Sequence, residues 1–149
     1  MEIKIKQLYE NAIIPSRGSS HAAGYDLYAM LNLKDGQTTI VINPGETKKI
    51  GTGIAVQCPK GTFGAVFARS GLATKQGLRP ANCVGVVDED YTGEIIVALH
   101  NDSYEKREIQ YGERIAQLVF IPYLSGDLLA VEELDETGRG DSGFGSTGQ

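Results

Sequence analysis

Residues 82–94 read NCVGVVDEDYTGE, which places three consecutive acids, Asp88, Glu89 and Asp90, directly behind a short apolar run. The Tyr-Thr-Gly triplet that follows is a turn signal before a second apolar run, so the stretch predicts a β-hairpin. In an extended arm, alternation puts Asp88 and Asp90 on one face and Glu89 on the other. Two carboxylates on one face can activate a water or bind a metal, but acids are also common in solvated turns.

The rest of the chain repeats short β-like runs separated by turn signals such as Asn43-Pro44-Gly45 and Pro59-Lys60-Gly61. Runs at this spacing favour an all-β barrel or sandwich over a parallel α/β fold. One short helix is expected at Gly71–Gln76, with Ser70 as its N-cap. The predicted strands are Glu2–Gln7, Thr38–Ile42, Thr47–Gln57, Thr62–Ala68, Glu94–His100, Arg114–Tyr123 and Leu128–Glu132.

The composition indicates one globular domain with many turns. The chain has 149 residues, of which 41% are hydrophobic, and its 19 glycines exceed the average usage of about 7%. The 14 basic and 19 acidic residues give a net charge of -5, which argues against broad binding to a nucleic-acid backbone or an anionic membrane. A few local arginines could still hold a single nucleotide.

The cysteines and the N-terminus favour a cytoplasmic protein. Cys58 and Cys83 lack CxxC spacing, so they suggest neither a disulfide framework nor a zinc site. The first ten residues have no apolar core of the kind that secretion signals carry. No run approaches the ~18 apolar residues of a membrane span, so we expect a soluble protein that is not exported.

The end of the chain, residues 137–149, contains five glycines and a single apolar side chain larger than alanine. We expect a β-barrel domain at 1–136 and a flexible arm at 137–149, either disordered or ordered by a ligand or neighbour. The arm matches GxGxxG at 143–148, but that motif needs a following helix or strand and only Gln149 remains. Its open backbone N–H groups, Arg139 and two hydroxyls would still suit a phosphate.

Polar residues also occur where the surrounding pattern is small or apolar. Arg69, Ser70 and Gly71 lie where a strand passes into the helix, and they suit either a phosphate site or an ordinary salt bridge and cap. Asp26 is either a structural acid or a ligand, and Gln117 needs hydrogen-bond partners inside an apolar run. The motifs GxxxxGK[ST], HExxH and GxSxG are absent, so the common routes to nucleotide or ester hydrolysis are not in use.

Five ordered motifs carry a resemblance to a known family. They are AAGYDLYA at 22–29, ARSGLA at 68–73, NCVGVVDEDYTGE at 82–94, YGERIAQL at 111–118 and RGDSGFGSTG at 139–148. Together they resemble the trimeric deoxyuridine triphosphate nucleotidohydrolases, the dUTPases. The resemblance implies a jelly-roll-like β-barrel, a homotrimer with active sites shared between subunits, and hydrolysis of dUTP to dUMP and pyrophosphate with Mg²⁺. Such an activity limits uracil incorporation into DNA and supplies dUMP for dTMP synthesis.

The resemblance also assigns roles to residues. Asp88 matches the carboxylate that activates the attacking water, and Asp26 matches an acid near the hydrated Mg²⁺. Asp90 and Glu89 become accessory or structural acids, and Ser142 departs from the glycine that the family usually has there. The matched substrate-binding residues are Asn82 and the backbone of Gly85 and Val87 for uracil, Tyr91 for deoxyribose, Arg69, Ser70, Gly71 and Gln117 for the phosphates, Arg139, Gly145, Ser146 and Thr147 in the arm for the γ-phosphate, and Phe144 as a lid over the base.

Two other functions remain as alternatives. A dCTP deaminase has a related trimeric fold, and ammonia release from dCTP would identify it. A regulatory protein could keep the same site as a nucleotide-sensing switch for a protein partner. Pull-down with and without a non-hydrolysable dUTP analogue would expose such a partner.

Overall fold

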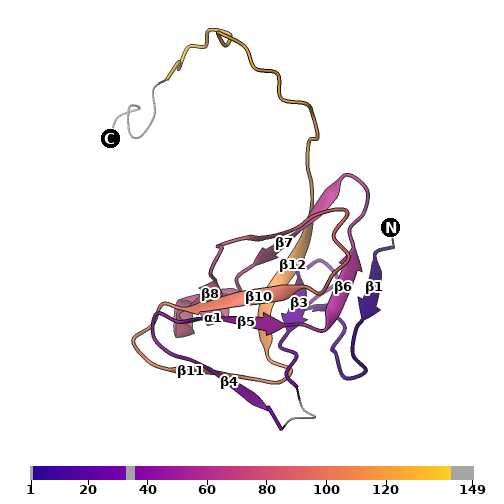
Figure 1. The fold of residues 1–149 in the computed structure, drawn as a ribbon, viewed down its shortest axis with the longest axis vertical. Helices are drawn as coiled ribbons and strands as arrows, with labels where there is room; N and C mark the ends of the chain where they lie inside the picture. Colours follow the sequence, from indigo (N-terminus) through magenta and orange to yellow (C-terminus); the bar gives the residue numbers. More distant parts are fainter. Residues whose placement is uncertain (1, 33–35, 142–149) are drawn as a thin grey trace.

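The computed structural model describes residues 2–32 and 36–141 and confirms an all-β fold with one short helix (Figure 1). Most strands are three to six residues long, as expected for a chain with this density of turn signals. The elements of the described residues are β1 (Lys4–Gln7), β2 (Ser16–Arg17), β3 (Tyr25–Tyr28), β4 (Thr39–Ile42), β5 (Thr47–Gly51), β6 (Ile54–Gln57), β7 (Thr62–Phe67), α1 (Ser70–Gln76), β8 (Leu78–Pro80), β9 (Gly85–Val87), β10 (Ile96–Asn101), β11 (Arg107–Gln110) and β12 (Arg114–Pro122).

The strands form hydrogen-bonded groups in which every pairing is antiparallel. The widest group has the order β2-β3-β12-β7-β9, so β12 lies at its centre and pairs along both edges. The orders of the other groups are β5-β10-β8, β1-β6 and β11-β4. Because consecutive strands often join different groups, the chain wraps repeatedly around one interior, which gives the expected jelly-roll-like arrangement.

The core lies between these groups and draws apolar side chains from most of the strands. A fully buried Leu or Ile side chain contributes roughly 1.5–3 kcal/mol of transfer free energy, so the set below is the main source of stability. The largest buried side chains of the core are Leu27, Ile42, Ile50, Ile54, Leu78, Val97, Leu99, Ile109, Ile115 and Leu118.

Two of the predicted strands differ from the structure. The predicted strand Thr47–Gln57 is broken at Thr52–Gly53, and its halves, β5 and β6, join different groups. Gly53 makes the corner possible because its φ of 67° lies in the left-handed region that favours glycine. The predicted strand Leu128–Glu132 does not form, since no strand in the described part of the chain pairs with this segment.

The predicted hairpin and helix cap are also wrong. Strand β9 pairs with β7, whereas β10 uses its two edges for β5 and β8, so the two arms of the expected hairpin do not pair. Helix α1 begins at Ser70 itself, and Arg69 occupies the N-cap position without a side-chain cap. Arg69 keeps an extended backbone, with φ −85° and ψ 127°, while its guanidinium reaches Asp26.

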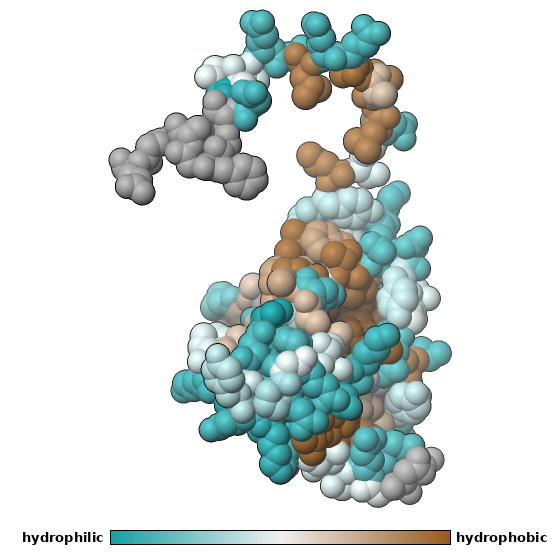
Figure 2. Space-filling view, turned by 60° about the vertical axis from the view of Figure 1, so that its left-hand side comes forward, coloured by the Kyte–Doolittle hydropathy of each residue, from teal (hydrophilic) through white to brown (hydrophobic). Residues whose placement is uncertain are grey.

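Beyond Tyr123 the chain leaves the sheets, and residues 124–141 run away from the body as an irregular segment (Figure 1). Leu124 and Leu128 are fully exposed, and Leu129 and Leu134 are 84% and 87% exposed. Figure 2 shows brown, apolar residues along the part of this segment that extends away from the body. Large apolar side chains are stabilised only by packing, so this segment is suited to lie against another surface.

No helix in the part of the chain that the structure describes has the length and apolar character needed to cross a membrane.

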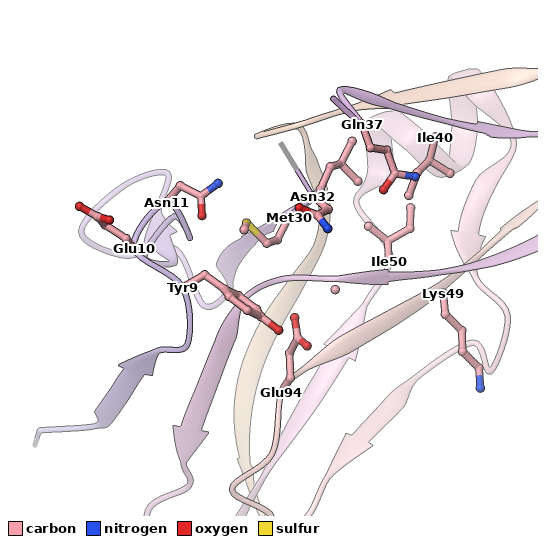
Figure 3. Close-up of a pocket in the computed structure, with 12 residues that line it drawn as sticks. Tyr9, Glu10, Asn11, Met30, Asn32, Gln37, Ile40, Lys49, Ile50 and Glu94 are labelled. Carbon is pink, nitrogen blue, oxygen red and sulfur yellow. The ribbon is translucent and has the colours of Figure 1, made fainter. Parts of the chain in front are cut away.

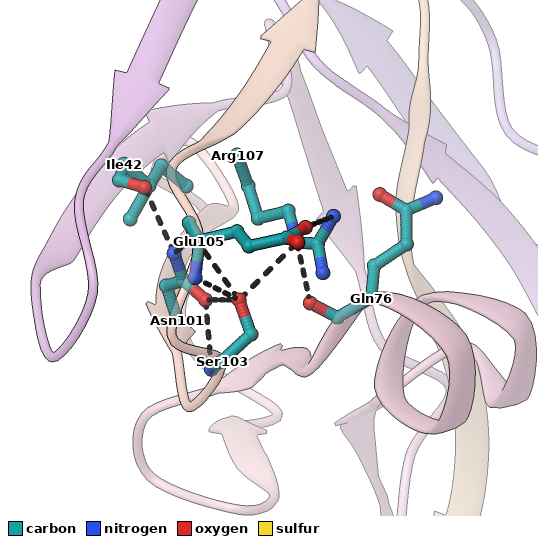
Figure 4. A network of polar contacts seen from close by, with 6 residues as sticks. All are labelled: Ile42, Gln76, Asn101, Ser103, Glu105 and Arg107. Atoms are coloured by element: carbon teal, nitrogen blue, oxygen red, sulfur yellow. Dashed lines mark hydrogen bonds and ion pairs between the residues drawn. The ribbon is translucent and has the colours of Figure 1, made fainter.

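A buried polar network ties the ends of several strands together (Figure 4). The side chain of Asn101 is inaccessible to solvent, and its amide N–H₂ donates to the carbonyls of Ile42, at 2.9 Å, and Glu105, at 2.8 Å. Its amide oxygen accepts from the N–H and the hydroxyl of Ser103. Arg107 Nε donates to Ser103 Oγ and to the carbonyl of Gln76 at the end of α1. One asparagine therefore links β4, β10 and the loop that leads to β11.

Replacing Asn101 with Ala should lower the free energy of unfolding by about 2–4 kcal/mol, because several buried partners would lose their hydrogen bonds at once. Urea denaturation measures the change. The exposed Asn43, whose amide contacts Glu46, provides the control, and Asn43→Ala should stay within about 0.5 kcal/mol of the parent protein. Equal losses for the two variants would contradict a structural role for the buried network.

Candidate functional site

The register of the widest sheet brings three of the sequence motifs to one place. On β12, Gln117 lies opposite Asp26 of β3 and opposite Phe67 of β7. Arg69 follows β7 by two residues, so it lies beyond the end of the same row. These residues line an open hollow of about 420 Å³, which we call the arginine hollow. Its lining residues are Gly18, Ala22, Ala23, Gly24, Asp26, Phe67, Arg69, Ser70, Gly71, Arg114, Gln117 and Val119.

The arginine hollow has a net positive charge. Asp26 Oδ1 accepts from Arg69 Nε at 2.9 Å, and Asp26 Oδ2 lies 3.3 Å from a terminal nitrogen of Arg114. Two guanidinium groups around one carboxylate leave one positive charge. The Arg114 side chain is 52% exposed and remains accessible to a ligand. Guanidinium groups bind phosphate and carboxylate oxygens well, so this hollow is suited to an anion.

Gln117 is held in the arginine hollow by its neighbours. Its side-chain Nε2 donates to the carbonyl of Ala68 at 2.9 Å, which supplies the hydrogen-bond partner that the sequence analysis expected for this amide. Gly24 leaves the space for this side chain, because a Cβ at position 24 would lie 2.4 Å from Gln117 Oε1. The glycine of the AAGYDLYA motif is therefore required by a close approach of the glutamine.

The unpaired arms of the expected hairpin enclose a second feature, which we call the β9 slot. It has a volume of about 90 Å³ and lies between β9, β10 and the end of β8. One edge of β9 pairs with β7, and no strand in the described part of the chain pairs with its other edge, so backbone groups there can face a ligand. The lining residues are Val66, Pro80, Asn82, Gly85, Val86, Val87, Ile96, Val97 and Ala98.

The three acids lie in a third feature, the acidic hollow, of about 610 Å³, lined by Phe63, Val86, Asp88, Glu89, Asp90 and Tyr123. Val86 lines both this hollow and the β9 slot, so the two features adjoin. Asp88 and Asp90 are exposed, whereas Glu89 is half-buried and bonds to groups behind the turn. The acids belong to a turn in which the Tyr91 N–H donates to the Asp88 carbonyl at 3.1 Å.

Two other groups support the acidic turn. Cys58 is buried under the end of β9, where its S–H donates to the Val87 carbonyl at 3.6 Å. Burial raises the pKa of the Cys58 thiol, and the nearby Glu89 and Asp88 charges add to the rise. The thiol therefore stays protonated at neutral pH. The Tyr91 hydroxyl donates to the Glu94 carbonyl at 2.8 Å, which folds its ring back over the turn.

The predicted site residues thus fall into two separate places within one chain. Asp26, Arg69, Ser70, Gly71 and Gln117 line the arginine hollow, and none of them lines the slot or the acidic hollow. Asn82, Gly85, Val87 and Asp88 line the other two features, and Tyr91 lies in the turn beside them. Arg139 lies on the exposed arm, whereas Phe144, Gly145, Ser146 and Thr147 lie outside the described residues.

Sequence reasoning missed two residues that the structure adds. Arg114 opens the predicted strand of the YGERIAQL motif, and only its pairing with Asp26 shows that it faces the arginine hollow. Tyr123 ends the same predicted strand and reaches Glu89. The sequence carries no signal for Arg114, because it lies three residues before Gln117 and alternation in a regular strand would put the two on opposite faces. A bulge between Arg114 and Ala116 changes that alternation.

A larger hollow, of about 740 Å³, lies elsewhere (Figure 3). Tyr9, Met30 and Ile50 line it, and Glu94 is the one residue of the acidic motif that reaches it. The Glu94 carboxylate accepts the Gly53 N–H at 2.8 Å, so this acid has a structural partner. The residues that the sequence analysis singles out line the arginine hollow, the β9 slot and the acidic hollow, and these three features form the candidate site.

The described residues do not form a metal centre by themselves. Among them, no group of three or more His, Cys, Asp or Glu side chains gathers closely enough to hold a metal ion. Both oxygens of Asp26 contact arginines. Mg²⁺ commonly binds through one or two carboxylates together with substrate phosphates and waters.

Comparison with known proteins agrees with this geometry. The dUTPase family model matches residues 10–148. The chain belongs to the dUTPase family. A deoxyuridine 5'-triphosphate nucleotidohydrolase from Desulfitobacterium hafniense is 49% identical over 136 residues, which cover 91% of this chain and 87% of that protein. The protein of the same name from Nautilia profundicola is 44% identical over 149 residues, with both chains covered completely.

Solved dUTPase structures share the fold. The Staphylococcus bacteriophage 80alpha dUTPase with dUPNHPP aligns with a TM-score of 0.88 and 30% identity and covers 99% of each chain. A mutant dUTPase from phage phi11 of S. aureus, solved to show how a structural Mg(II) ion is coordinated, aligns with a TM-score of 0.78 and 27% identity. That alignment covers 89% of this chain and 98% of the phage chain.

Gly24→Ala should weaken the binding of inorganic tripolyphosphate to this dUTPase-family chain by about three- to tenfold. The new Cβ would push the Gln117 side chain away from Ala68 and out of the arginine hollow. The anion would then lose roughly one hydrogen bond, which corresponds to this change in affinity. Isothermal titration calorimetry measures the affinity. Gly18 lines the same hollow, and an added Cβ there meets nothing within 4 Å, so Gly18→Ala is the matched control. The same affinity for both variants would remove Gln117 from the anion site.

Proposed function

We propose that the protein hydrolyses dUTP to dUMP and pyrophosphate. The observation that carries this proposal is the whole-length likeness to the N. profundicola protein named deoxyuridine 5'-triphosphate nucleotidohydrolase. The geometry supports it. The narrow β9 slot with its open backbone edge suits a base, the carboxylate at the edge of the slot suits a water, and the positive hollow suits a triphosphate. The reaction would limit uracil incorporation into DNA and supply dUMP for dTMP synthesis.

The β9 slot would read the uracil ring. Uracil presents a donor at N3 between two carbonyl acceptors, and the open edge of β9 near Gly85 and Val87 offers backbone acceptors and donors for this pattern. Cytosine reverses the pattern at N3 and C4, and thymine adds a methyl group that a slot of about 90 Å³ would reject. Asn82 lines the slot and can hydrogen-bond the base, while Tyr91 would lie under the deoxyribose.

The arginine hollow would bind the phosphates. Arg69 and Arg114 supply positive charge, and Ser70, Gly71 and Gln117 supply hydrogen-bond donors along the same wall. In the arm, Arg139 and residues 145–147 would grip the γ-phosphate, and Phe144 would cover the base. Closure of the arm would shed water and favour the triphosphate over the product, because a glycine-rich segment is costly to order without a ligand.

Asp88 would act as the general base. Its exposed carboxylate would take a proton from a water while the water oxygen bonds to the α-phosphorus, and the bond from that phosphorus to the bridging oxygen breaks. Pyrophosphate leaves with the bridging oxygen, and dUMP keeps the new one. Mg²⁺ carried by the triphosphate would neutralise phosphate charge, with Asp26 near its bound waters.

We also propose a homotrimer with shared active sites that works in the cytoplasm. The arginine hollow and the acidic hollow have no lining residue in common, so a single chain offers the parts at two places. The exposed leucines between β12 and the arm, Leu124, Leu128, Leu129 and Leu134, are suited to pack on a neighbouring subunit. Both cysteines are free thiols, which fits a reducing compartment. Light scattering on the purified protein would return the mass of three chains, and an active monomer would end the proposal.

Substrate selectivity tests the proposed function. With Mg²⁺ present, the protein should release pyrophosphate from dUTP at least ~10²-fold faster, in kcat/KM, than from dCTP, dTTP or UTP. Cytosine would mismatch the hydrogen-bond donors and acceptors of the slot, the thymine methyl group would not fit in it, and the Tyr91 ring under the deoxyribose would leave no room for the 2′-hydroxyl of UTP. Pyrophosphate release is measured with each nucleotide separately. Equal turnover of dTTP would contradict the role of the slot, equal turnover of UTP would contradict the role of Tyr91, and ammonia release from dCTP would identify a deaminase instead.

Asp88→Asn should lower kcat by ~10² or more, the usual scale for losing a general base, and leave the binding of a non-hydrolysable dUTP analogue nearly unchanged. Asp90 lies in the same turn and is also exposed, so Asp90→Asn controls for the loss of one negative charge and should cost far less. Steady-state kinetics and calorimetry measure the two effects. If Asp90→Asn proved as damaging, the choice of Asp88 as base would be wrong.

A further inference from the structure

Glu89 joins the acidic turn to two segments behind it. Its Oε2 accepts the backbone N–H of Gly61 at 2.7 Å and the hydroxyl of Tyr123 at 3.2 Å. Gly61 belongs to the turn between β6 and β7, and Tyr123 follows the last residue of β12. One carboxylate oxygen therefore connects three parts of the chain that are far apart in sequence.

The two segments behind Glu89 are themselves well fixed. The Tyr123 N–H donates to the Gly61 carbonyl at 3.2 Å, and the Thr62 N–H and hydroxyl both donate to the Pro59 carbonyl. The Tyr123 ring packs edge-on against Phe63, with ring centroids 6.5 Å apart. A rigid turn and a rigid strand end thus hold Glu89, whereas Asp88 next to it is exposed.

Tyr123 is also the last residue that the sheets hold before the arm. Its backbone and hydroxyl both bond to the body, whereas the next residue, Leu124, is fully exposed. The hydrogen bond to Glu89 raises the pKa of the Tyr123 phenol, with the Glu89 charge as the next cause. The hydroxyl therefore keeps its proton and stays a donor through neutral pH.

We propose that Glu89, held by Gly61 and Tyr123, is a positioning residue that fixes the Asp88 carboxylate for catalysis. This role rests on the proposed function, because it concerns the general base of that reaction. A water-activating carboxylate must be held to within a fraction of an ångström, and a misplacement of about 1 Å can cost ~10²-fold in rate. Asp88 follows the last paired residue of β9 directly, and Glu89 is the side chain that fastens its turn to the strands behind.

The contact needs an acceptor and not a charge. Both hydrogen bonds end on the same oxygen, Oε2, and an oxygen with two lone pairs can accept both. A glutamine can place its amide oxygen at that point. Glu89→Gln should therefore preserve the positioning, whereas Glu89→Ala should lose both bonds and Tyr123→Phe only one, with the ring packing on Phe63 kept.

Steady-state kinetics with dUTP, together with affinities for a non-hydrolysable dUTP analogue and melting temperatures, test the proposal on the full chain. We expect Glu89→Ala to lower kcat about tenfold, Tyr123→Phe about threefold and Glu89→Gln less than twofold, with analogue affinity unchanged in all three. The double variant Glu89→Ala/Tyr123→Phe should be no slower than Glu89→Ala, because both changes break the same contact. Glu108→Ala and Tyr104→Phe make the same changes at exposed positions and should leave kcat unchanged.

Hydrogen exchange provides a readout that does not depend on activity. Glu89→Ala should speed amide exchange at residues 59–62 and at 88–91, and Glu89→Gln should not. Normal kcat in Glu89→Ala with only a lower melting temperature would reduce Glu89 to a structural role and overturn the proposal. Kinetic losses that multiply in the double variant, or a Glu89→Gln variant as slow as Glu89→Ala, would also overturn it. If the parent protein shows the expected amide exchange but does not hydrolyse dUTP, the proposed function is refuted, and the positioning role is refuted with it.

Discussion

Strand β12 hydrogen-bonds along both of its edges, and this pairing determines where the functional groups lie. Its register with β3 and β7 sets Gln117 between Asp26 and Phe67, so motifs from three distant parts of the sequence meet in one row. The bulge between Arg114 and Ala116 turns Arg114 toward Asp26, which completes the positive hollow. At its far end the same strand delivers Tyr123 to the acidic turn. If the register of β12 slipped by one residue, every side chain of the strand would face the opposite side of the sheet, and both contacts would be lost.

The second constraint is a pairing that does not form. Strands β9 and β10 follow each other in sequence, yet β9 uses β7, and β10 uses β5 and β8. The gap between them becomes the β9 slot, with backbone groups on the open edge of β9 and Asp88 directly at its end. An unpaired edge is normally costly unless water or a ligand satisfies it. We propose that the base of the nucleotide satisfies this edge of β9.

Sequence reasoning predicted the all-β class, most strand positions and the family, because turn residues and short ordered motifs are local signals. It failed where long-range pairing decides the outcome. The Asp88 turn looks like the end of a hairpin, but the partners of β9 and β10 come from elsewhere in the chain. Ser70 has the chemistry of a cap, but the helix begins at Ser70 itself, and Arg69, whose side chain pairs with Asp26, takes the N-cap position. Arg114 looked like an ordinary strand residue until the bulge and the register showed which way it points.

The central claim is that a single chain carries two incomplete halves of one nucleotide site, which neighbouring subunits bring together. A crystal structure of the protein with Mg²⁺ and a non-hydrolysable dUTP analogue tests it most directly. The account predicts that one analogue molecule places its base in the β9 slot next to Asp88 of one subunit and its phosphates against Arg69 and Gln117 of another. An analogue held by Asp88 and Arg69 of the same chain, or a base bound outside the slot, would contradict the account.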